Sequence, residues 1–360
     1  MKQYGHGGDV YTACSKLGTS IDELVDFSAN INPFGIPEAV KEALSQAIEE
    51  AMHYPDAYCR ALTELIATHH QTKEAYILCG NGAADLIFRL VYTLKPHKGQ
   101  VCAPTFSEYE LALRSMDAKV CYYHLKAEHD FKLDEAFIES LTPDLDILFL
   151  CNPNNPTGVT ASKEFLIRVL DRCKRLNIIC MVDECFNDFI EDAEALTLVP
   201  ELENYPNLVI LKAFTKMYAI PGVRLGYALS SNTALLEGMY AAGQCWSVSS
   251  LAQAAGCAAI KETAFVTQTV TYIKHERKQM IAQLSKLGYK VYPSEANYIL
   301  FHGKNIPLDK LLYEEGILIR NCDNYKGLDK GYFRVAVKQT AQNEKLMALI
   351  ERMTKQWENH

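Results

Sequence analysis

The chain has 360 residues, 49% of them hydrophobic and 22% charged, which is enough for a large globular domain and a smaller one. Its formal charge of −8 argues against a nucleic-acid partner, and the lack of a long apolar run predicts no membrane span. The twelve cysteines form no Cys-x-x-Cys pair and the N-terminus lacks the apolar core of a signal peptide, so we expect reduced thiols and a cytoplasmic location.

The first 34 residues predict an irregular N-terminal arm. Glycines surround His6 in Gly5-His6-Gly7-Gly8, and glycine lets a backbone approach a ligand closely. A flexible tail is the alternative, as it is for any terminus. Ser28-Ala29-Asn30 follows a short apolar run, which favours an ordered role for it. Helical patterns then cover residues 37–52 and 60–70.

A strand, a glycine turn and a helix follow one another from residue 76. Tyr76-Ile77-Leu78-Cys79 is the strand, and Gly80-Asn81-Gly82-Ala83 leads into an apolar helical run. Backbone amides at such a helix N-terminus can hold a phosphate, although many turns of this kind hold nothing. The next strand, 100–103, leads to Phe106, which could stack on a ligand ring or could simply belong to the core.

Three later strands carry an amide, a carboxylate and an amine at their ends. The apolar runs are 147–150, 178–182 and 208–211, and they lead to Asn155, Asp183 and Lys216. In open α/β sheets, ligands bind at the carboxyl ends of parallel strands. A lysine in this position suits an imine with a carbonyl cofactor, and Arg224, eight residues on, suits a phosphate. A lysine on a surface loop is the alternative.

The order of elements predicts two kinds of architecture. Strands and helices alternate from 76 to 230, with helices at 134–141 and 162–176, which indicates a mainly parallel sheet with helices on both faces. Residues 233–285 are predicted to be helical and to include a long helix that crosses to a smaller domain. From 286 onward an α+β pattern is expected, with strands near 289–292, 296–300, 317–320 and 332–337 and a closing helix near 341–355.

Asn152-Pro153-Asn154-Asn155-Pro156-Thr157-Gly158, Asp183-Glu184, and Thr215-Lys216 through Arg224 together resemble the pyridoxal-phosphate (PLP) aminotransferase superfamily of the aspartate-aminotransferase fold. The resemblance extends over almost the whole chain. It implies an α/β fold: a large domain with a mainly parallel seven-stranded sheet, and a smaller α+β domain. The implied divisions are an N-terminal arm, 1–34, a large PLP-binding domain, 35–250, and a small C-terminal domain, 251–360.

The same resemblance implies roles for individual residues. Lys216 would form the Schiff base and donate a proton to the carbanion, and Asp183 would pair with the protonated pyridine nitrogen. Tyr54 would reach the cofactor phosphate of a neighbouring subunit, so a homodimer with shared active sites is expected. The full set of implied cofactor-binding residues is Gly82, Ala83, Phe106, Asn155, Asp183, Thr215, Lys216, Arg224 and Tyr54. No metal is expected.

Within the superfamily, the chain is most similar to the threonine-phosphate decarboxylases of cobalamin synthesis. The segments that carry this similarity are 5–9, 26–33, 219–227 and 320–328. The aminotransferases usually have tyrosine where this chain has Phe186, whereas the decarboxylases tolerate phenylalanine. The implied substrate is L-threonine O-3-phosphate or L-serine O-phosphate, and the implied substrate-binding residues are His6, Gly7, Asn30, Asn155, Arg320 and Arg334. Surface ion pairing is the alternative for the two arginines, but a phosphate and a carboxylate suit them electrostatically.

Three other functions remain to be weighed. Histidinol-phosphate aminotransferase uses the same cofactor. Whether such an enzyme decarboxylates or transaminates depends on which bond of the substrate's α-carbon stands perpendicular to the imine plane, and a sequence does not give this angle. A non-catalytic PLP-binding regulator is disfavoured by the presence of Lys216, Asp183 and Arg224 together and by the lack of a DNA-binding extension. A dinucleotide-binding reductase is disfavoured because no Gly-x-Gly-x-x-Gly follows a first strand.

Overall fold

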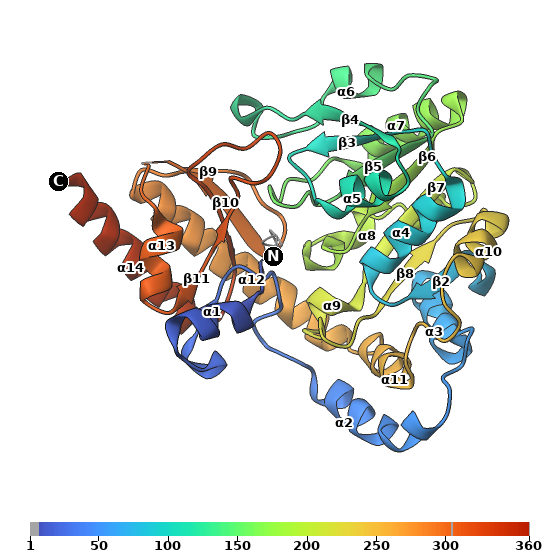
Figure 1. The fold of residues 1–360 in the computed structure, drawn as a ribbon, viewed down its shortest axis with the longest axis horizontal. Helices are drawn as coiled ribbons and strands as arrows, with labels where there is room; N and C mark the ends of the chain where they lie inside the picture. The colour runs from blue at the N-terminus through green and yellow to red at the C-terminus, as the bar shows by residue number, and fades with distance from the viewer. Residues whose placement is uncertain (1–6, 304, 360) are drawn as a thin grey trace.

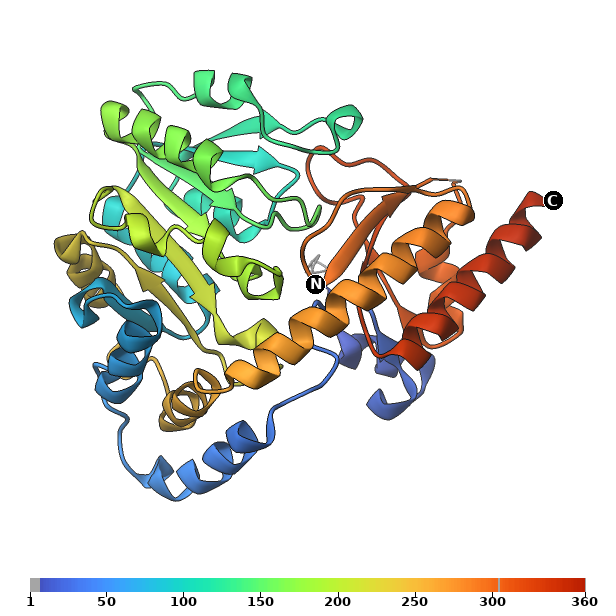
Figure 2. The same ribbon diagram turned by 180° about the vertical axis from the view of Figure 1, so that it is seen from behind.

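The computed structural model describes residues 7–303 and 305–359. Two lobes lie side by side, one built around a large sheet and one around smaller sheets (Figure 1). Helix α12, Thr263–Lys286, runs from the large lobe into the small one, where α14, Thr340–Glu358, packs against it (Figure 2). Within the described residues, no helix has the length and apolar character needed to span a membrane.

The large lobe contains a seven-stranded sheet in the order β2-β8-β7-β6-β5-β3-β4. All neighbouring strands are parallel except where β8 pairs antiparallel with β2 and β7. This confirms the predicted mainly parallel seven-stranded sheet. The strands are β2 Ile77–Gly80, β3 Lys98–Ala103, β4 Lys119–His124, β5 Ile147–Cys151, β6 Ile179–Asp183, β7 Leu208–Ala213 and β8 Gly226–Leu229.

The central strands are continuous apolar runs because helices cover both faces of the sheet. In β7, Leu208 and Ile210 point into one hydrophobic core, and Val209 and Leu211 point into the other. Helix α4 packs against β2, β7 and β8, while α7 packs against β6 and α3 against β2. With both faces buried, polar residues can appear only where the strands end.

The remaining helices connect and cover these strands. In the large lobe they are α2 Glu38–Ala47, α3 Arg60–His70, α4 Ala83–Leu94, α5 Glu108–Ser115, α6 Glu135–Glu139, α7 Lys163–Leu176, α8 Ala193–Leu196, α9 Phe214–Met217, α10 Thr233–Ala241 and α11 Ser250–Ala259. Short 3-10 turns lie at Ile21–Glu23, Glu49–Met52, Glu74–Tyr76, Ala127–His129, Asn187–Phe189 and Val199–Glu201. Helix α11, which begins at the predicted domain boundary, packs against α2 and α3. The division of the chain near residue 250 stays a prediction.

The small lobe holds an antiparallel four-stranded sheet and a two-stranded parallel pair. The first has the order β12-β13-β10-β9, from Arg320–Asn321, Tyr332–Ala336, Tyr298–His302 and Lys290–Val291. The second joins β1, Val25–Asp26, to β11, Ile317–Leu318. Helices α1, Val10–Leu17, and α13, Leu308–Glu314, complete this lobe with α14. The N-terminal strand is thereby fixed to residues near the other end of the chain.

Two segments differ from the sequence-based expectation. The arm is not irregular throughout, because α1 begins where the Asp9 side chain accepts from Thr12 N and ends at Gly18, whose φ of 66° suits a left-handed cap. The predicted helical stretch 233–285 is divided into α10, α11 and α12. Ser249 begins α11 by accepting a hydrogen bond from Ala252 N.

Candidate active site

Lys216 lies in α9, the single helical turn that follows the buried strand β7. Its carbonyl oxygen accepts a hydrogen bond from Asn32 N, and the carbonyl of Met217 accepts from Asn32 Nδ2 at 2.7 Å. The N-terminal arm therefore holds the backbone of the lysine in place. The described residues provide no hydrogen-bond or ion-pair partner for the Lys216 amine.

The electrostatic environment makes this amine unusually easy to deprotonate. Removal of the amine from water lowers the pKa of Lys216 to about 8, and the positive charges of Arg334 and Arg224 act in the same direction. The Cys185 thiol and Asp183 oppose the shift. An uncharged amine is the form that attacks a carbonyl carbon.

Asp183 ends β6 and is 5% exposed. Its Oδ2 accepts a hydrogen bond from Tyr109 Oη at 2.6 Å, and its Oδ1 accepts one from Cys185 N at 2.9 Å. Burial raises the pKa of the Asp183 carboxyl above its ordinary value, and the hydrogen bonds from Cys185 and Tyr109 oppose that rise. The carboxylate is thus held from two sides at a strand end.

The glycine turn after β2 makes a close approach to Arg224. Gly82 has φ 82° and begins α4 without a side-chain cap, which leaves backbone N–H groups of the first turn available to an anion. A Cβ on Gly82 would lie 2.5 Å from Arg224 Nη2, so a larger residue would displace the guanidinium, and the positive φ also favours glycine. Arg224 has φ 62°, and its Nη1 donates to the carbonyl of Pro221. The helix N-terminus and the Arg224 guanidinium therefore lie close enough together to bind one anion.

Asn155 and Arg334 meet across the two lobes. Arg334 is 5% exposed; its Nη1 donates to Asn155 Oδ1, and its Nη2 donates to the carbonyl of Ser28 at 2.7 Å. The guanidinium also lies over the ring of Tyr298, 5.4 Å from its centroid. Its Nε has no hydrogen-bond partner in the described part of the chain. The guanidinium therefore has an unused donor in a buried position.

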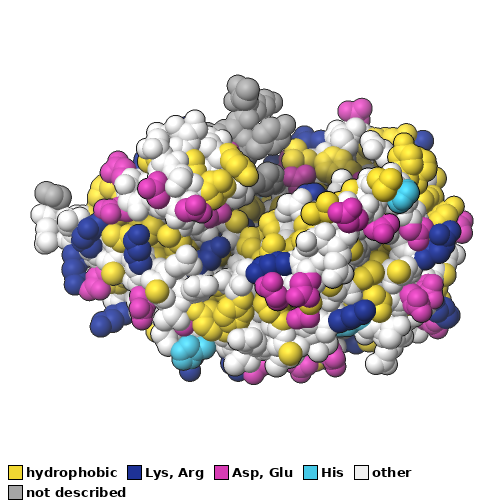
Figure 3. Space-filling model, turned by 90° about the horizontal axis from the view of Figure 1, so that it is seen from below, with side chains coloured by type: hydrophobic (Ala, Val, Ile, Leu, Met, Phe, Trp, Pro, Cys, Tyr) yellow, Lys and Arg dark blue, Asp and Glu magenta, His cyan; other side chains and the backbone are white. Residues whose placement is uncertain are grey.

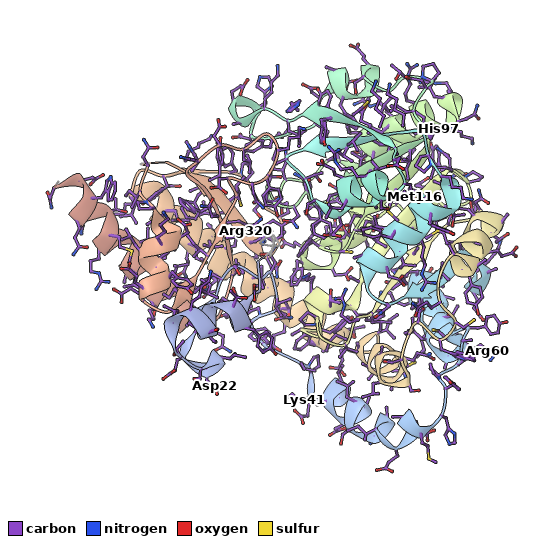
Figure 4. The ribbon with its side chains drawn as sticks, in the orientation of Figure 1. Asp22, Lys41, Arg60, His97, Met116 and Arg320 are labelled. Carbon is purple, nitrogen blue, oxygen red and sulfur yellow. The ribbon has the colours of Figure 1, made fainter. Side chains whose placement is uncertain are left out.

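Arg320 is the register partner of Arg334 on neighbouring antiparallel strands. It lies at the centre of the molecule, where the two lobes face each other (Figure 4). Its Nη2 donates to Asn324 Oδ1 at 2.7 Å, and its guanidinium lies 5.2 Å from the centroid of the Tyr325 ring. Arg320 also lines a cavity of about 450 Å³ together with Phe106. The two predicted substrate arginines are thus neighbours.

The N-terminal arm contributes to the same region. A Cβ on Gly7 would lie 2.2 Å from the carbonyl oxygen of Ser28, the group that also accepts from Arg334. Asn30 is buried, and its Oδ1 has no hydrogen-bond partner among residues 7–303 and 305–359. His6, which was predicted to close over the substrate, lies outside the described residues.

The aromatic residues of the site differ in exposure. Phe106 is half-buried and makes an edge contact with Tyr109, with ring centroids 5.6 Å apart. Phe186 is buried and makes an edge contact with Tyr298 at 5.0 Å. Phe186 offers no hydroxyl group to a ligand. Thr215 is also buried, beside Lys216 in α9.

Tyr54 lies apart from these residues within one chain. It is 79% exposed and stacks on Trp246, which is 47% exposed, with centroids 4.3 Å apart. The face seen from below in Figure 3 mixes hydrophobic side chains with basic and acidic ones, and charge of one sign does not dominate it. The structure brings together the other described site residues, but Tyr54 points outward.

Sequence reasoning missed Tyr109 and a buried ion pair next to the site. Lys212 Nζ lies 3.3 Å from Glu184 Oε2 and 3.2 Å from Asp188 Oδ1. Although burial opposes it, Asp188 and Glu184 raise the pKa of Lys212 above its ordinary value. A lysine within the apolar run 208–213 was the available signal, because a buried amine needs a charged partner. Tyr109 gave no signal, because an aromatic residue soon after a strand end is more often ordinary core.

The chain is similar to known proteins over nearly its full length. The sequence model of the family "Aminotransferase class I and II" matches residues 22–352. The threonine-phosphate decarboxylase of Salmonella typhimurium is 41% identical, covering 96% of this chain and 95% of that protein. A bifunctional adenosylcobalamin biosynthesis protein of Leptospira interrogans is 30% identical, covering 95% of this chain and 40% of that protein. The crystal structure of the histidinol-phosphate aminotransferase of Clostridium acetobutylicum has a TM-score of 0.87 at 31% identity, covering 92% of this chain and 100% of that one.

Proposed function

The chain belongs to the class I and II aminotransferase family, and from this premise we propose that it decarboxylates L-threonine O-3-phosphate or L-serine O-phosphate. The product would be the aminoalkyl phosphate used to assemble the nucleotide loop of cobalamin. The protein is a PLP-dependent enzyme. Similarity to a threonine-phosphate decarboxylase over nearly the full length of both proteins supports the choice of reaction.

The side chains of the site fit PLP. The N-terminus of α4, with the Arg224 guanidinium directly beside Gly82, suits the cofactor phosphate. Lys216 would hold the cofactor through its amine, and Asp183 would keep a proton on the ring nitrogen. Asn155 would hydrogen-bond the phenolic oxygen, with its Oδ1 already fixed by Arg334. Phe106 is assigned to the face of the cofactor ring. Ala83 and Thr215 are assigned to the cofactor phosphate.

The paired arginines are the observation that carries the substrate proposal. Arg320 and Arg334 are register partners, so two positive charges lie near one another where the lobes meet. Neighbouring positive charges attract anionic ligands, and a phospho-amino acid carries a phosphate and a carboxylate. The unpartnered Nε of Arg334 and Oδ1 of Asn30 are buried polar atoms that a bound substrate would satisfy. We assign Gly7 and His6 to the same end of the substrate.

Each residue of the site has a separate role in the proposed reaction. When bound, PLP supplies an electron-withdrawing ring that stabilises negative charge at the α-carbon. The arginines would fix the two anionic groups and thereby set the orientation of the substrate carboxylate. The Lys216 amine would then deliver a proton to the α-carbon after carbon dioxide leaves. Phe186, in place of a tyrosine, removes one hydroxyl donor near the ring.

We also propose a homodimer with shared sites. Tyr54 and Trp246 form an exposed aromatic stack, and exposed aromatic side chains are typical of protein interfaces. In a dimer, Tyr54 would reach the cofactor phosphate held by the neighbouring subunit. This would explain why Tyr54 points outward from its own chain.

The test is identification of the product. The PLP-loaded enzyme is incubated separately with phosphothreonine, phosphoserine and histidinol phosphate, with and without 2-oxoglutarate. We expect loss of carbon dioxide and an aminoalkyl phosphate in the mass spectrum without need of 2-oxoglutarate. Carboxyl-labelled substrate should release its label as carbon dioxide. Consumption of 2-oxoglutarate with histidinol phosphate, and no carbon dioxide from either phospho-amino acid, would refute decarboxylation.

Histidinol-phosphate aminotransferase is the second candidate. The observation in its favour is the close structural similarity to the Clostridium acetobutylicum enzyme over nine-tenths of this chain. Both candidates use PLP and a phosphorylated amine, but histidinol phosphate has no carboxylate, so the paired arginines favour the phospho-amino acid. The requirement for 2-oxoglutarate separates them.

A further inference from the structure

Tyr109 connects two groups that are expected to contact the cofactor ring. Its hydroxyl donates to Asp183 Oδ2 at 2.6 Å, and its ring meets the edge of Phe106 at an interplanar angle of 80°. Asp183 is assigned to the ring nitrogen and Phe106 to the ring face. One side chain therefore touches both residues that would contact the pyridine ring, without being among the predicted site residues itself.

Tyr109 is held rigidly. It lies in the first turn of α5, is 0% exposed, and stacks on Phe149 of β5 with centroids 5.1 Å apart and planes within 9°. Burial and the neighbouring Asp183 raise the pKa of Tyr109 well above its ordinary value. The hydroxyl therefore keeps its proton throughout the neutral range and donates it in a hydrogen bond to the carboxylate.

We propose that Tyr109 is a positioning residue whose hydroxyl fixes the Asp183 carboxylate and keeps the shared proton on the ring nitrogen of the cofactor. The inference rests on the proposed role of Asp183 and deepens it. A hydrogen bond to a carboxylate stabilises its charged form. Without this donor, the buried carboxylate would bind the proton more strongly than the ring nitrogen does, and the ring would withdraw fewer electrons.

Tyr109→Phe is the direct test, because it removes only the hydroxyl and keeps both ring contacts. Two quantities are measured on purified protein without substrate: the dissociation constant of PLP and the ¹⁵N resonance of ring-labelled PLP. We expect PLP to bind roughly ten- to a hundred-fold more weakly, the range for loss of a hydrogen bond to a charged group. The ¹⁵N resonance should move toward that of an unprotonated pyridine.

Two comparisons separate positioning from general stability. Tyr205→Phe is the matched control, because Tyr205 Oη also donates to a carboxylate, Asp171 Oδ1, at 2.8 Å, outside the site. It should leave both measurements unchanged. In an Asp183→Asn background, Tyr109→Phe should have no further effect on the ¹⁵N resonance, because residue 183 then has no carboxylate whose proton affinity the hydroxyl could lower.

An unchanged ¹⁵N resonance in Tyr109→Phe would overturn the proposal, as would an equal loss of PLP affinity in the Asp183→Asn background. These measurements need no substrate. They can therefore fail while product analysis still finds decarboxylation, and they can succeed if the enzyme proves to be an aminotransferase. The two proposals are tested separately.

Discussion

Lys212 and Lys216 lie four residues apart at the end of β7, yet their amines differ in charge state. Lys212 is paired with Glu184 and Asp188, and its pKa lies above the ordinary value. Lys216 has arginines nearby, and its pKa falls to about 8. Of the two, Lys216 loses its proton more readily near neutral pH, so its environment rather than its residue type marks it as the candidate nucleophile.

The first prediction concerns the site of attachment. Borohydride reduction of the PLP-loaded protein should fix the cofactor on Lys216 and leave Lys212 unmodified, because an ion-paired amine is protonated. Peptide mass mapping locates the adduct. Lys216→Ala should lose it, and Lys338→Ala in the small lobe serves as the control. An adduct that persists in Lys216→Ala would rule out this lysine.

The second prediction concerns pH. The rate at which apoprotein captures PLP should rise with pH and level off above about 8, because the free amine is the reactive form. Since the charge of Arg334 lowers this pKa, Arg334→Met should move the midpoint upward, toward the ordinary lysine value of 10.5. Stopped-flow absorbance measures the rate. Arg320→Met is the control and should leave the midpoint unchanged; a downward shift in Arg334→Met would contradict the electrostatic explanation.

At the scale of elements, β12 and β13 place the two substrate arginines opposite each other. Arg320 pairs with Arg334, and Asn321 with Phe333. Directly opposed residues on antiparallel strands project to the same face of the sheet. Like charges in such positions repel, and bound anions relieve that repulsion. The pairing therefore favours a ligand with two negative groups.

The third prediction follows from this pairing. Arg320→Ala and Arg334→Ala should each keep full PLP stoichiometry at pH 9 and lose roughly ten- to a hundred-fold or more in kcat/KM, because each removes charge-assisted hydrogen bonds to substrate. Steady-state kinetics with phosphothreonine and threonine measure the loss. The variant that lacks the phosphate-binding arginine should discriminate poorly between the two, and the other should still prefer phosphothreonine.

Arg352→Ala is the control for this experiment, because its partner Glu315 forms an ion pair with it on an exposed surface. It should behave as wild type. Wild-type kinetics in both Arg320→Ala and Arg334→Ala would refute a dianionic substrate and direct attention to a less charged one.

The fold could be predicted from the sequence largely because its central strands are buried on both faces. Such strands appear as uninterrupted apolar runs, so their polar ends at Asp183 and Lys216 are easy to locate. The edge strand β4 was not predicted, and its residues are half-buried or exposed. Helix α1 was not predicted, because the glycines of the N-terminal arm favour an irregular structure. The register of Arg320 on Arg334 and the contact of Tyr109 with Asp183 depend on tertiary packing, which local patterns do not encode.

At the scale of the whole molecule, two segments of the large lobe carry exposed apolar side chains. They come from the segment after α2 and from the connection between α10 and α11: Ile48, Met52, Tyr54, Tyr58 and Trp246. Clustered exposed side chains of this type mark interaction surfaces. A second copy of the chain is the proposed partner, and Tyr54 is the residue through which the partner would complete the site.

The fourth prediction tests this sharing. Tyr54→Ala and Lys216→Ala homodimers should each be nearly inactive. When equal amounts are unfolded and refolded together, half of the dimers should be mixed, and each mixed dimer should contain one intact site. We therefore expect about a quarter of wild-type activity to return. The control is each variant refolded alone. If the mixture shows no recovery although mixed dimers are detected by mass, Tyr54 does not act across the interface.

The pairing of β1 with β11 has a consequence for the order in which the protein acquires its structure. Val25 contacts Ile317, about 290 residues later, so the N-terminal arm cannot dock until the ribosome has released nearly the whole chain. The strands of the large sheet, by contrast, all lie between residues 77 and 229 and can pair during synthesis. We therefore expect the N-terminal arm, which is synthesised first, to dock among the last segments of the chain. Because Asn32 of that arm holds the backbone of Lys216, we expect the candidate site to be complete only after the arm has docked.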